Sequence, residues 1–377
     1  MKSKVPDKKI VKKKVVILIN DTTYAFNLRG ETIKELIDEG YEVVVVGQLL
    51  KHQNRLTEMG AKVIGVETER HGTNPFSDFI LMRTYRRILR VERPGVVLTY
   101  NIKPNVYGGM VCRLLKIPYI SNITGLGTPL ENPGRLRKLI IWLYKTGISG
   151  ASYVFFQNSS NKAFFEQNKM LSRQAKVKVL PGSGVNLDKN YYESYPSEKN
   201  GIRFLFVGRI MKDKGIGELL QAIHILHNDY EHIYLDVVGG CDEDYSDVLE
   251  RAEKKGEIKY HGLQENVHPF YASCHCTVLP SYHEGMANVM LEASATGRPV
   301  ITTTVPGCRE TFDEGVTGYG CQAKNVDSLV QAMKQFLSLS PEKRAVMGKA
   351  ARLKMERDFD RKKVNHIYLN AIKSIDR

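Results

Sequence analysis

Short runs of β-branched and aliphatic residues alternate with amphipathic stretches along this 377-residue chain. The alternation predicts repeated βα units, in which buried parallel strands are covered by helices. In the first half the predicted strands are residues 15–20, 42–46, 63–66, 96–100, 119–122, 153–157 and 177–180. A second series of predicted strands follows at 203–207, 234–238, 258–261, 276–279 and 300–303. The fold class is therefore α/β.

A proline, glycine and polar segment separates the two strand series and predicts a domain boundary. The chain is also longer than one ordinary domain, and two domains of roughly 150–200 residues suit its length. We expect a lysine-rich N-terminal tail, a first domain, a linker, a second domain and a C-terminal helix. Their predicted ranges are 1–14, 15–186, 187–200, 201–355 and 356–377.

The formal net charge of +14 is unevenly distributed. Residues 1–199 hold 32 Lys and Arg against 17 Asp and Glu, whereas residues 200–377 hold 23 against 24. No apolar run approaches the ~20 residues that span a bilayer, and no hydrophobic signal segment follows the lysines. Six cysteines without paired-motif spacing suit a reducing compartment, and Cys274-His275-Cys276 alternates across a predicted strand. These features predict a cytoplasmic protein without a bound metal.

Two basic amphipathic stretches in the first half are candidates for a membrane surface. One is a helical stripe of arginines, and the other is a broad apolar helix flanked by cations. The stripe comprises Arg83, Arg86, Arg87 and Arg90; the second stretch has Leu136, Leu139, Ile140, Leu143 and Tyr144 beside Arg135, Arg137, Lys138 and Lys145. We predict peripheral attachment to anionic lipid. The alternative for each stretch is a solvated charged face over a helix packed in the core.

Four charged residues follow predicted strands of the second half, where open α/β sheets bind ligands. Arg209 and Lys214 come after strand 203–207, and two such cations can neutralise a diphosphate. Glu284 and Glu292 bracket a predicted helix start after strand 276–279, and carboxylates accept hydrogen bonds from vicinal hydroxyls. Amides at a helix start suit phosphate. The pattern indicates a sugar-nucleotide site; solvated loop charges are the alternative.

With these residues, the segments 284–292 (EGMANVMLE), 297–302 (GRPVIT), 305–310 (VPGCRE) and 315–318 (GVTG) make the second half resemble the sugar-donor domain of family 4 glycosyltransferases. That resemblance implies the GT-B fold, in which two doubly wound Rossmann-like domains face across a cleft and a C-terminal helix crosses back to the first domain. It implies that Arg209 and Lys214 contact the donor diphosphate, that Glu292 binds the ribose and that Glu284 lies at the sugar. The implied donor-binding set also includes Gly208, Gly285, Met286, Ala287 and Asn288, the last four through backbone amides.

First-half segments at 100–109, 122–127, 155–158 and 180–185 resemble the subgroup that builds bacterial surface glycans such as capsule, O-antigen or lipid-linked oligosaccharide. This implies a nucleoside-diphosphate sugar, with UDP favoured, and an acceptor saccharide on polyprenyl pyrophosphate at the inner membrane face. The resemblance further implies retention at the anomeric carbon, without a cofactor or divalent metal. Leaving-group departure would be assisted by Arg209 and Lys214.

The acceptor side departs from the wider family at two places. Thr124-Gly125 stands where many relatives carry a histidine, and the segment 21–29 stands where they often carry a Gly-Gly pair. The acceptor-side candidates are Asn27 and Arg29 in segment 21–29, and Lys103, Asn105, Asn122, Thr124 and Gly125 after predicted strands. For Lys103, Asn105, Asn122 and Thr124, core capping or loop hydrogen bonding is an equal alternative. Gly125 and Gly127 either form a flexible loop or let the backbone approach the sugar closely.

Three other function classes are alternatives, and the sequence supports them unequally. A sugar-nucleotide epimerase or hydrolase can use a related two-domain fold, and a nucleic-acid-binding protein can use a basic half. Against nucleic acid stands the lack of a known reader motif or of interleaved stacking aromatics. A nicotinamide-dependent oxidoreductase lacks support because neither half has a G-x-G-x-x-G turn. Asp242-Glu-Asp244 has metal-motif spacing but is interpreted as a solvated loop.

Overall fold

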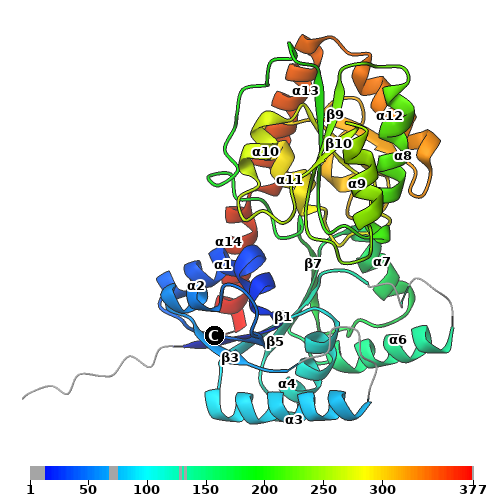
Figure 1. Ribbon diagram of the computed structural model, residues 1–377. Helices are drawn as coiled ribbons and strands as arrows, with labels where there is room; N and C mark the ends of the chain where they lie inside the picture. Colours follow the sequence, from blue (N-terminus) through cyan, green and yellow to red (C-terminus); the bar gives the residue numbers. More distant parts are fainter. Residues whose placement is uncertain (1–12, 68–74, 127–129, 131–133, 376–377) are drawn as a thin grey trace, which may run out of the picture. The chain divides into compact units, whose positions relative to one another are not determined.

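The computed structural model describes residues 13–67, 75–126, 130 and 134–375, and it divides into two compact units (Figure 1). Unit 1 contains the chain up to Phe156, then Lys162–Lys178 and the C-terminal residues from Asn365. Unit 2 contains Gln157–Asn161 and Val179–Val364. Each unit is built on its own parallel sheet with helices, so the predicted α/β class with two Rossmann-like domains is confirmed.

The sheet of unit 1 has seven strands in the order β3-β2-β1-β4-β5-β6-β7. Strands β1, β2 and β4 carry runs of buried apolar residues, as expected where helices cover both faces of a sheet. The strands are β1 (Lys14–Asp21), β2 (Glu42–Gln48), β3 (Lys62–Gly65), β4 (Val96–Tyr100), β5 (Tyr119–Ile123), β6 (Tyr153–Phe156) and β7 (Lys176–Val179). The order reverses at β1, so β1 and β4 are neighbours although three helices and two strands separate them in the chain.

The helices of unit 1 follow their strands closely. Asp21, at the end of β1, caps α1 by accepting a hydrogen bond of 2.8 Å from the amide of Tyr24. These helices are α1 (Thr22–Asp38), α2 (Gln53–Glu58), α3 (Pro75–Glu92), the π-turn η1 (Pro104–Gly108), α4 (Gly109–Leu115), α6 (Arg135–Ile148) and α7 (Ser159–Gln167). Among the described residues, no helix combines the length and apolar character needed to cross a bilayer.

The C-terminal helix α14 (Arg361–Ile375) follows the π-turn η4 (Met355–Phe359) and packs into unit 1 from Asn365 onward. Its Tyr368 hydroxyl donates to Oδ1 of Asn122 at 2.5 Å, and Thr32 donates to Asn365 at 2.7 Å. The Arg29 guanidinium lies 4.5 Å from the ring centre of Tyr100 and 5.8 Å from that of Tyr368. The predicted return of this helix to the first domain is confirmed.

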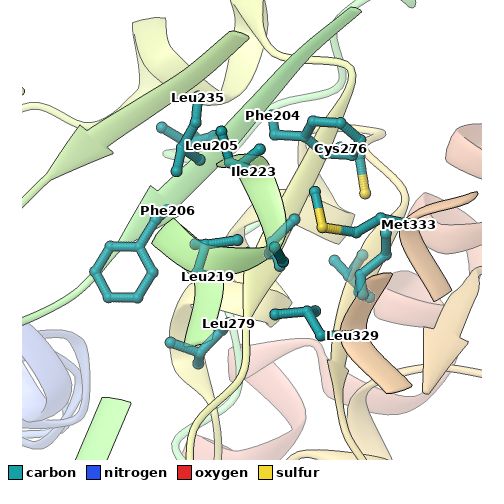
Figure 2. Packing of buried hydrophobic residues seen from close by; sticks show 14 of the residues in the cluster. Phe204, Leu205, Phe206, Leu219, Ile223, Leu235, Cys276, Leu279, Leu329 and Met333 are labelled. Carbon is teal, nitrogen blue, oxygen red and sulfur yellow. The ribbon is translucent and has the colours of Figure 1, made fainter. Parts of the chain in front are cut away.

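The sheet of unit 2 has six strands in the order β10-β9-β8-β11-β12-β13, and it also reverses at its first strand. Figure 2 shows its core, where Phe204 and Phe206 of β8 lie with Leu219 and Ile223 of α8 and with Leu279 of β11. The strands are β8 (Ile202–Val207), β9 (Ile233–Val238), β10 (Ile258–Tyr260), β11 (Cys276–Leu279), β12 (Val300–Thr303) and β13 (Gly318–Cys321). The helices are η2 (Lys212–Lys214), α8 (Ile216–His227), α9 (Ser246–Lys254), α10 (His268–Ser273), α11 (Asn288–Ala295), η3 (Arg309–Thr311), α12 (Val326–Leu337) and α13 (Pro341–Lys354).

The segment predicted as a linker, residues 187–200, is an integral part of unit 2. Arg298, which is fully buried, donates to the carbonyl oxygens of Glu193 and Ser194 in that segment at 3.1 and 2.9 Å. The same guanidinium donates to the carbonyl oxygens of Tyr271 and Ala272 in α10 at 2.8 and 2.9 Å. The segment is therefore held to unit 2 through its backbone, while many of its side chains, such as Asp188, Lys189 and Lys199, stay exposed.

Candidate functional site

The candidate site of unit 2 lies on the loops that follow β8 and β11. These strands are neighbours at the point where the strand order reverses, which is the ligand position in open α/β sheets. The first loop runs from Gly208 through η2 to Gly215, and the second runs from Pro280 to Ala287 and ends where α11 begins at Asn288. The structure thus confirms the helix start that was predicted between Glu284 and Glu292.

The two loops hold each other through backbone contacts. The carbonyl oxygen of Asp213 accepts hydrogen bonds from the amide of Tyr282 at 2.9 Å and from the Ser281 hydroxyl at 3.2 Å. Gly215 has a φ of 71°, and a Cβ there would lie 2.1 Å from the carbonyl oxygen of Pro280. Only glycine permits this approach, so the loop geometry depends on that residue.

Lys214 of the first loop forms an ion pair with Glu284 of the second. Both side chains are largely shielded from solvent, at 18% and 15% exposed, so the pair is only partly weakened by water. The backbone of Glu284 lies close to Gly307, where a Cβ would be 2.3 Å from the Glu284 carbonyl oxygen, so a side chain at Gly307 would displace this loop. The structure thus brings together one cation and one carboxylate that the sequence placed at this site.

Arg209 belongs to the first loop but pairs with a different carboxylate. Its guanidinium Nη1 lies 2.7 Å from Oδ2 of Asp242, and both side chains are about half exposed. The neighbouring Glu243 accepts a hydrogen bond of 2.8 Å from the amide of Lys212. Two acids of the segment interpreted as a solvated loop therefore organise the first loop. Across the described residues, no group of three His, Cys, Asp or Glu side chains is arranged as a metal site.

Glu292 lies one turn inside α11 and is half-buried. Its Oε2 accepts a hydrogen bond of 3.0 Å from the hydroxyl of Tyr271, a buried residue of α10. Burial raises the pKa of Glu292 above its usual value, and the Tyr271 bond with the positive charges of Lys189 and Arg361 offsets this only in part. Sequence reasoning missed Tyr271, because one aromatic residue in a short helix gives no signal of its contact.

Some backbone amides around the start of α11 donate to an acceptor within the protein, and others do not. The amide of Ala287 donates to Gly307 at 2.8 Å and that of Asn288 donates to Met286 at 2.9 Å. The amide of Gly208 donates to Val238 at 3.0 Å. By contrast, no protein acceptor is recorded in the described part of the chain for the amides of Gly285, Met286 and Val289. The expected donation from the amides of Gly285 to Asn288 to the sugar and phosphate stays a prediction, and Ala287 and Asn288 already have protein acceptors.

In unit 1, the candidates Asn105 and Asn122 are buried and tie strand ends together. Asn105 donates to the carbonyl oxygen of Asn122 at 2.8 Å and accepts from the Thr99 hydroxyl at 2.6 Å. Asn122 donates to the carbonyl oxygen of Thr99 at 3.1 Å. Lys103 forms an ion pair of 2.9 Å with Asp78, so it joins η1 to α3. These contacts give all three candidates a structural role.

The remaining acceptor-side candidates differ in exposure. Arg29 is buried against Tyr100, as described above, whereas Asn27 on α1 is exposed. Thr124 and Gly125 follow β5 and are half-buried. Gly127, which was quoted with them as part of a motif, lies outside the described residues. The accessible candidates in unit 1 are therefore Asn27, Thr124 and Gly125.

Two family models match the chain in succession. Residues 14–158 match "Glycosyl transferase 4-like", and residues 188–354 match "Glycosyl transferases group 1". A similar curated protein is the N,N'-diacetylbacillosaminyl-diphospho-undecaprenol alpha-1,3-N-acetylgalactosaminyltransferase of Campylobacter jejuni, 26% identical over 83% of this chain and 86% of that protein. Another is the capsular polysaccharide biosynthesis glycosyltransferase CapM of Staphylococcus aureus, 24% identical over 75% of this chain and 78% of that protein.

Solved structures share the fold over nearly the whole chain. A glycosyltransferase of Rickettsia africae ESF-5 superposes with a TM-score of 0.78 over 97% of this chain and 99% of that protein, at 18% sequence identity. Anabaena Alr3699/HepE, solved in complex with UDP and glucose, superposes with a TM-score of 0.77. The match covers 96% of this chain and 100% of that protein, at 16% sequence identity. The expected GT-B fold is thereby confirmed.

The raised pKa of Glu292 gives a prediction for stability. A carboxyl that is harder to ionise when folded costs stability as pH rises through its folded-state pKa, and costs nothing below its unfolded pKa. At pH 7 we expect Glu292→Gln to raise the free energy of unfolding by roughly 0.5–2 kcal/mol, so that the variant unfolds at a higher temperature than the parent. The gain should disappear toward pH 4. Thermal unfolding followed by calorimetry at both pH values measures it.

Glu250→Gln is the matched control, because Glu250 is an exposed acid of α9 in the same unit. Its stability should change by no more than about 0.5 kcal/mol. A loss of stability in Glu292→Gln at pH 7 would contradict the prediction, since the hydrogen bond from Tyr271 would then outweigh the cost of burial.

Proposed function

Because the chain belongs to the glycosyltransferases that combine a 4-like domain with a group 1 domain, we propose that it moves a sugar from a nucleoside-diphosphate sugar to a saccharide carried on polyprenyl diphosphate. The observation that carries the proposal is the Lys214–Glu284 pair, held between interlocked loops at the reversal point of the unit 2 sheet. The acceptor class is supported by the diphospho-undecaprenol named for the Campylobacter relative, and a surface-glycan role by the capsular relative.

In this proposal the sugar donor is held at its charged diphosphate and at its neutral hydroxyl groups. Lys214 and Arg209 contact the diphosphate, together with the open amides of Gly285, Met286 and Val289. Glu292 accepts hydrogen bonds from the ribose hydroxyls, and Glu284 lies at the sugar. We favour UDP as the nucleotide, in line with the UDP complex of a protein that shares the fold. The two cations supply the countercharge that a divalent metal supplies in other transferases, so no metal is required.

The reaction proceeds with retention in this proposal. The bond between the anomeric carbon and the diphosphate oxygen breaks, and negative charge grows on the leaving diphosphate. Cations and amides fixed around that charge stabilise the transition state more than the ground state. The acceptor hydroxyl attacks from the same face, and its proton passes to the leaving phosphate. Glu284 and Glu292 thus recognise the sugar donor and transfer no proton.

Unit 1 presents a surface suited to a membrane that holds a lipid-linked acceptor. On α6, the side chains of Leu136, Leu139 and Trp142 are 46%, 51% and 60% exposed, although they occupy the apolar stripe of the helix. Only Tyr144, Gly147 and Ile148 of that helix are buried. The packing of α6 against the core therefore leaves an apolar row uncovered, which the core-packing alternative does not explain.

Helix α3 of unit 1 has exposed cations and exposed apolar side chains as well. Helix α4 contacts both α3 and α6, so the three lie together in unit 1. Arg83, Arg86, Arg87 and Arg90 of α3 are all exposed, and so are the apolar side chains of Phe79 and Ile80. Cations beside exposed apolar groups match an anionic bilayer, which offers charge and hydrocarbon together. We therefore propose peripheral attachment at the inner membrane face through α3 and α6, and not nucleic-acid binding.

Transfer to a lipid-linked acceptor tests the function directly. We expect the purified protein, incubated with a panel of UDP and GDP sugars and a polyprenyl-diphosphate saccharide, to add one sugar to the acceptor. Mass spectrometry detects the added mass, and nuclear magnetic resonance reports the anomeric configuration. Rapid nucleotide release or sugar isomerisation without acceptor would favour the epimerase or hydrolase alternative instead.

Removing both cations should slow the chemical step. We expect Arg209→Ala combined with Lys214→Ala to lower kcat by about 10²–10³, because charge on the leaving diphosphate loses its fixed partners. Lys212→Ala is the matched control, since Lys212 is an exposed cation of the same short helix. Steady-state kinetics with the accepted sugar donor measures both. A folded double variant with near-parent kcat would remove these residues from the site.

Membrane attachment should depend on the α3 arginines. We expect the variant with Arg83, Arg86, Arg87 and Arg90 changed to Gln to bind phosphatidylglycerol-containing vesicles at least tenfold more weakly, since each cation near such a surface contributes about 1 kcal/mol. Co-sedimentation measures the bound fraction. The matched control neutralises four exposed cations of unit 2: Arg251, Lys254, Lys255 and Lys259. Equal loss in both variants, or none in either, would contradict the assignment.

A further inference from the structure

Asn158 occupies an unusual place in the structure. It follows β6 of unit 1, but the short segment Gln157–Asn161 belongs by its contacts to unit 2. Its side chain is 1% exposed and both of its polar atoms are bound. Oδ1 accepts from the amide of Asn161 at 2.8 Å, and Nδ2 donates to the carbonyl oxygen of Gly285 at 2.8 Å. The first bond fixes which end of the amide is oxygen, so the contact with Gly285 requires an N–H donor.

The contact at Gly285 fixes the direction of the next amide. A trans peptide points its C=O and N–H in opposite directions, and the described chain contains no cis peptide bond. The Met286 amide therefore points away from Asn158. It is one of the loop amides for which no protein acceptor is recorded in the described chain.

The Met286 side chain holds the other end of this peptide. It is buried in an apolar cluster with Val185, Leu291, Met355 and Phe359. Gly182, with a φ of 61°, approaches it so closely that a Cβ would lie 2.5 Å from its Cγ. The Gly285 carbonyl group and the Met286 side chain are thus both held in place. The Met286 N–H between them is therefore a preorganised hydrogen-bond donor.

We propose that Asn158 is a positioning residue, which holds the Gly285–Met286 peptide so that the Met286 amide donates to the diphosphate of the sugar donor. This rests on the proposed function. Asn158 touches neither substrate nor reacting atoms, and it acts through the peptide it binds. An amide that is fixed before the reaction stabilises growing charge on the leaving diphosphate without reorganisation. Loss of Asn158 should therefore affect kcat more than ground-state nucleotide binding.

Asn158→Asp removes one of the two hydrogen bonds: the carboxylate still accepts from the Asn161 amide but cannot donate to the Gly285 carbonyl oxygen. We expect kcat for the sugar donor accepted by the parent to fall at least tenfold, while the Kd of UDP or GDP, measured by calorimetry, rises less than about threefold. Asn158→Ser, whose hydroxyl keeps a hydrogen-bond donor, should retain more kcat than Asn158→Asp.

Asn168→Asp is the matched control. Asn168 makes the same kind of bond, from Nδ2 to the carbonyl oxygen of Phe164 at 2.8 Å, after α7 in unit 1. It should keep parent kcat within about twofold. A folded Asn158→Asp with parent kcat, or one whose kcat and nucleotide affinity fall equally, would overturn the proposal. Failure of both Asn158 variants to fold, with Asn168→Asp folded, would also overturn it and assign Asn158 to structure alone.

The parent enzyme separates this inference from the proposed function. If the parent transfers no sugar from any tested nucleotide, the proposed function fails and Asn158 loses its role with it. If the parent is active and Asn158→Asp matches it, only the positioning role of Asn158 fails.

Discussion

The site of unit 2 depends on the contact between two loops that leave neighbouring strands. The Asp213 carbonyl binds Tyr282 and Ser281, and Gly215 lies against the Pro280 carbonyl at a distance that excludes any side chain. Because β8 and β11 are adjacent only through the reversal of strand order, residues about seventy positions apart meet there. The ion pair between Lys214 and Glu284 follows from this backbone arrangement, since each side chain extends from a loop already held in place.

Behind the loops, buried polar groups orient the residues that face a ligand. Arg298 binds carbonyl oxygens of α10 and of segment 187–200, and α10 carries Tyr271, whose hydroxyl binds Glu292. Burying a guanidinium is costly unless its N–H groups have acceptors, and here carbonyl oxygens provide them. Because α10 supplies some of these oxygens, Arg298 holds α10 against segment 187–200. Glu292 is kept in a position where burial disfavours its charge. That cost is typical of a group placed for binding and not for stability.

The sequence predicted the strands and the loops that follow β8 and β11 well, because both rest on local signals. Apolar runs predicted every strand except β13, whose Gly318 and Gly320 suggest a turn. A Cβ on Gly318 would lie 2.1 Å from the Val300 carbonyl oxygen, so glycine is needed there for close strand packing. Contacts between distant segments gave no such signal. The polar segment 187–200 looked like a linker, and nothing local marked the bonds of Asn158 or Tyr271.

The pairing of both cations with carboxylates bears on what the site selects. The pair between Arg209 and Asp242 is half exposed, so a diphosphate can displace Asp242 at little cost. Glu284 is more shielded, and a diphosphate that attracts Lys214 leaves this carboxylate without its partner. An unpaired shielded charge is unfavourable unless new hydrogen-bond donors replace the ammonium. Sugar hydroxyls next to the diphosphate provide such donors, whereas a free nucleoside diphosphate does not. For the function proposed above, the pair therefore favours nucleotide sugars over the nucleotide product, which assists product release.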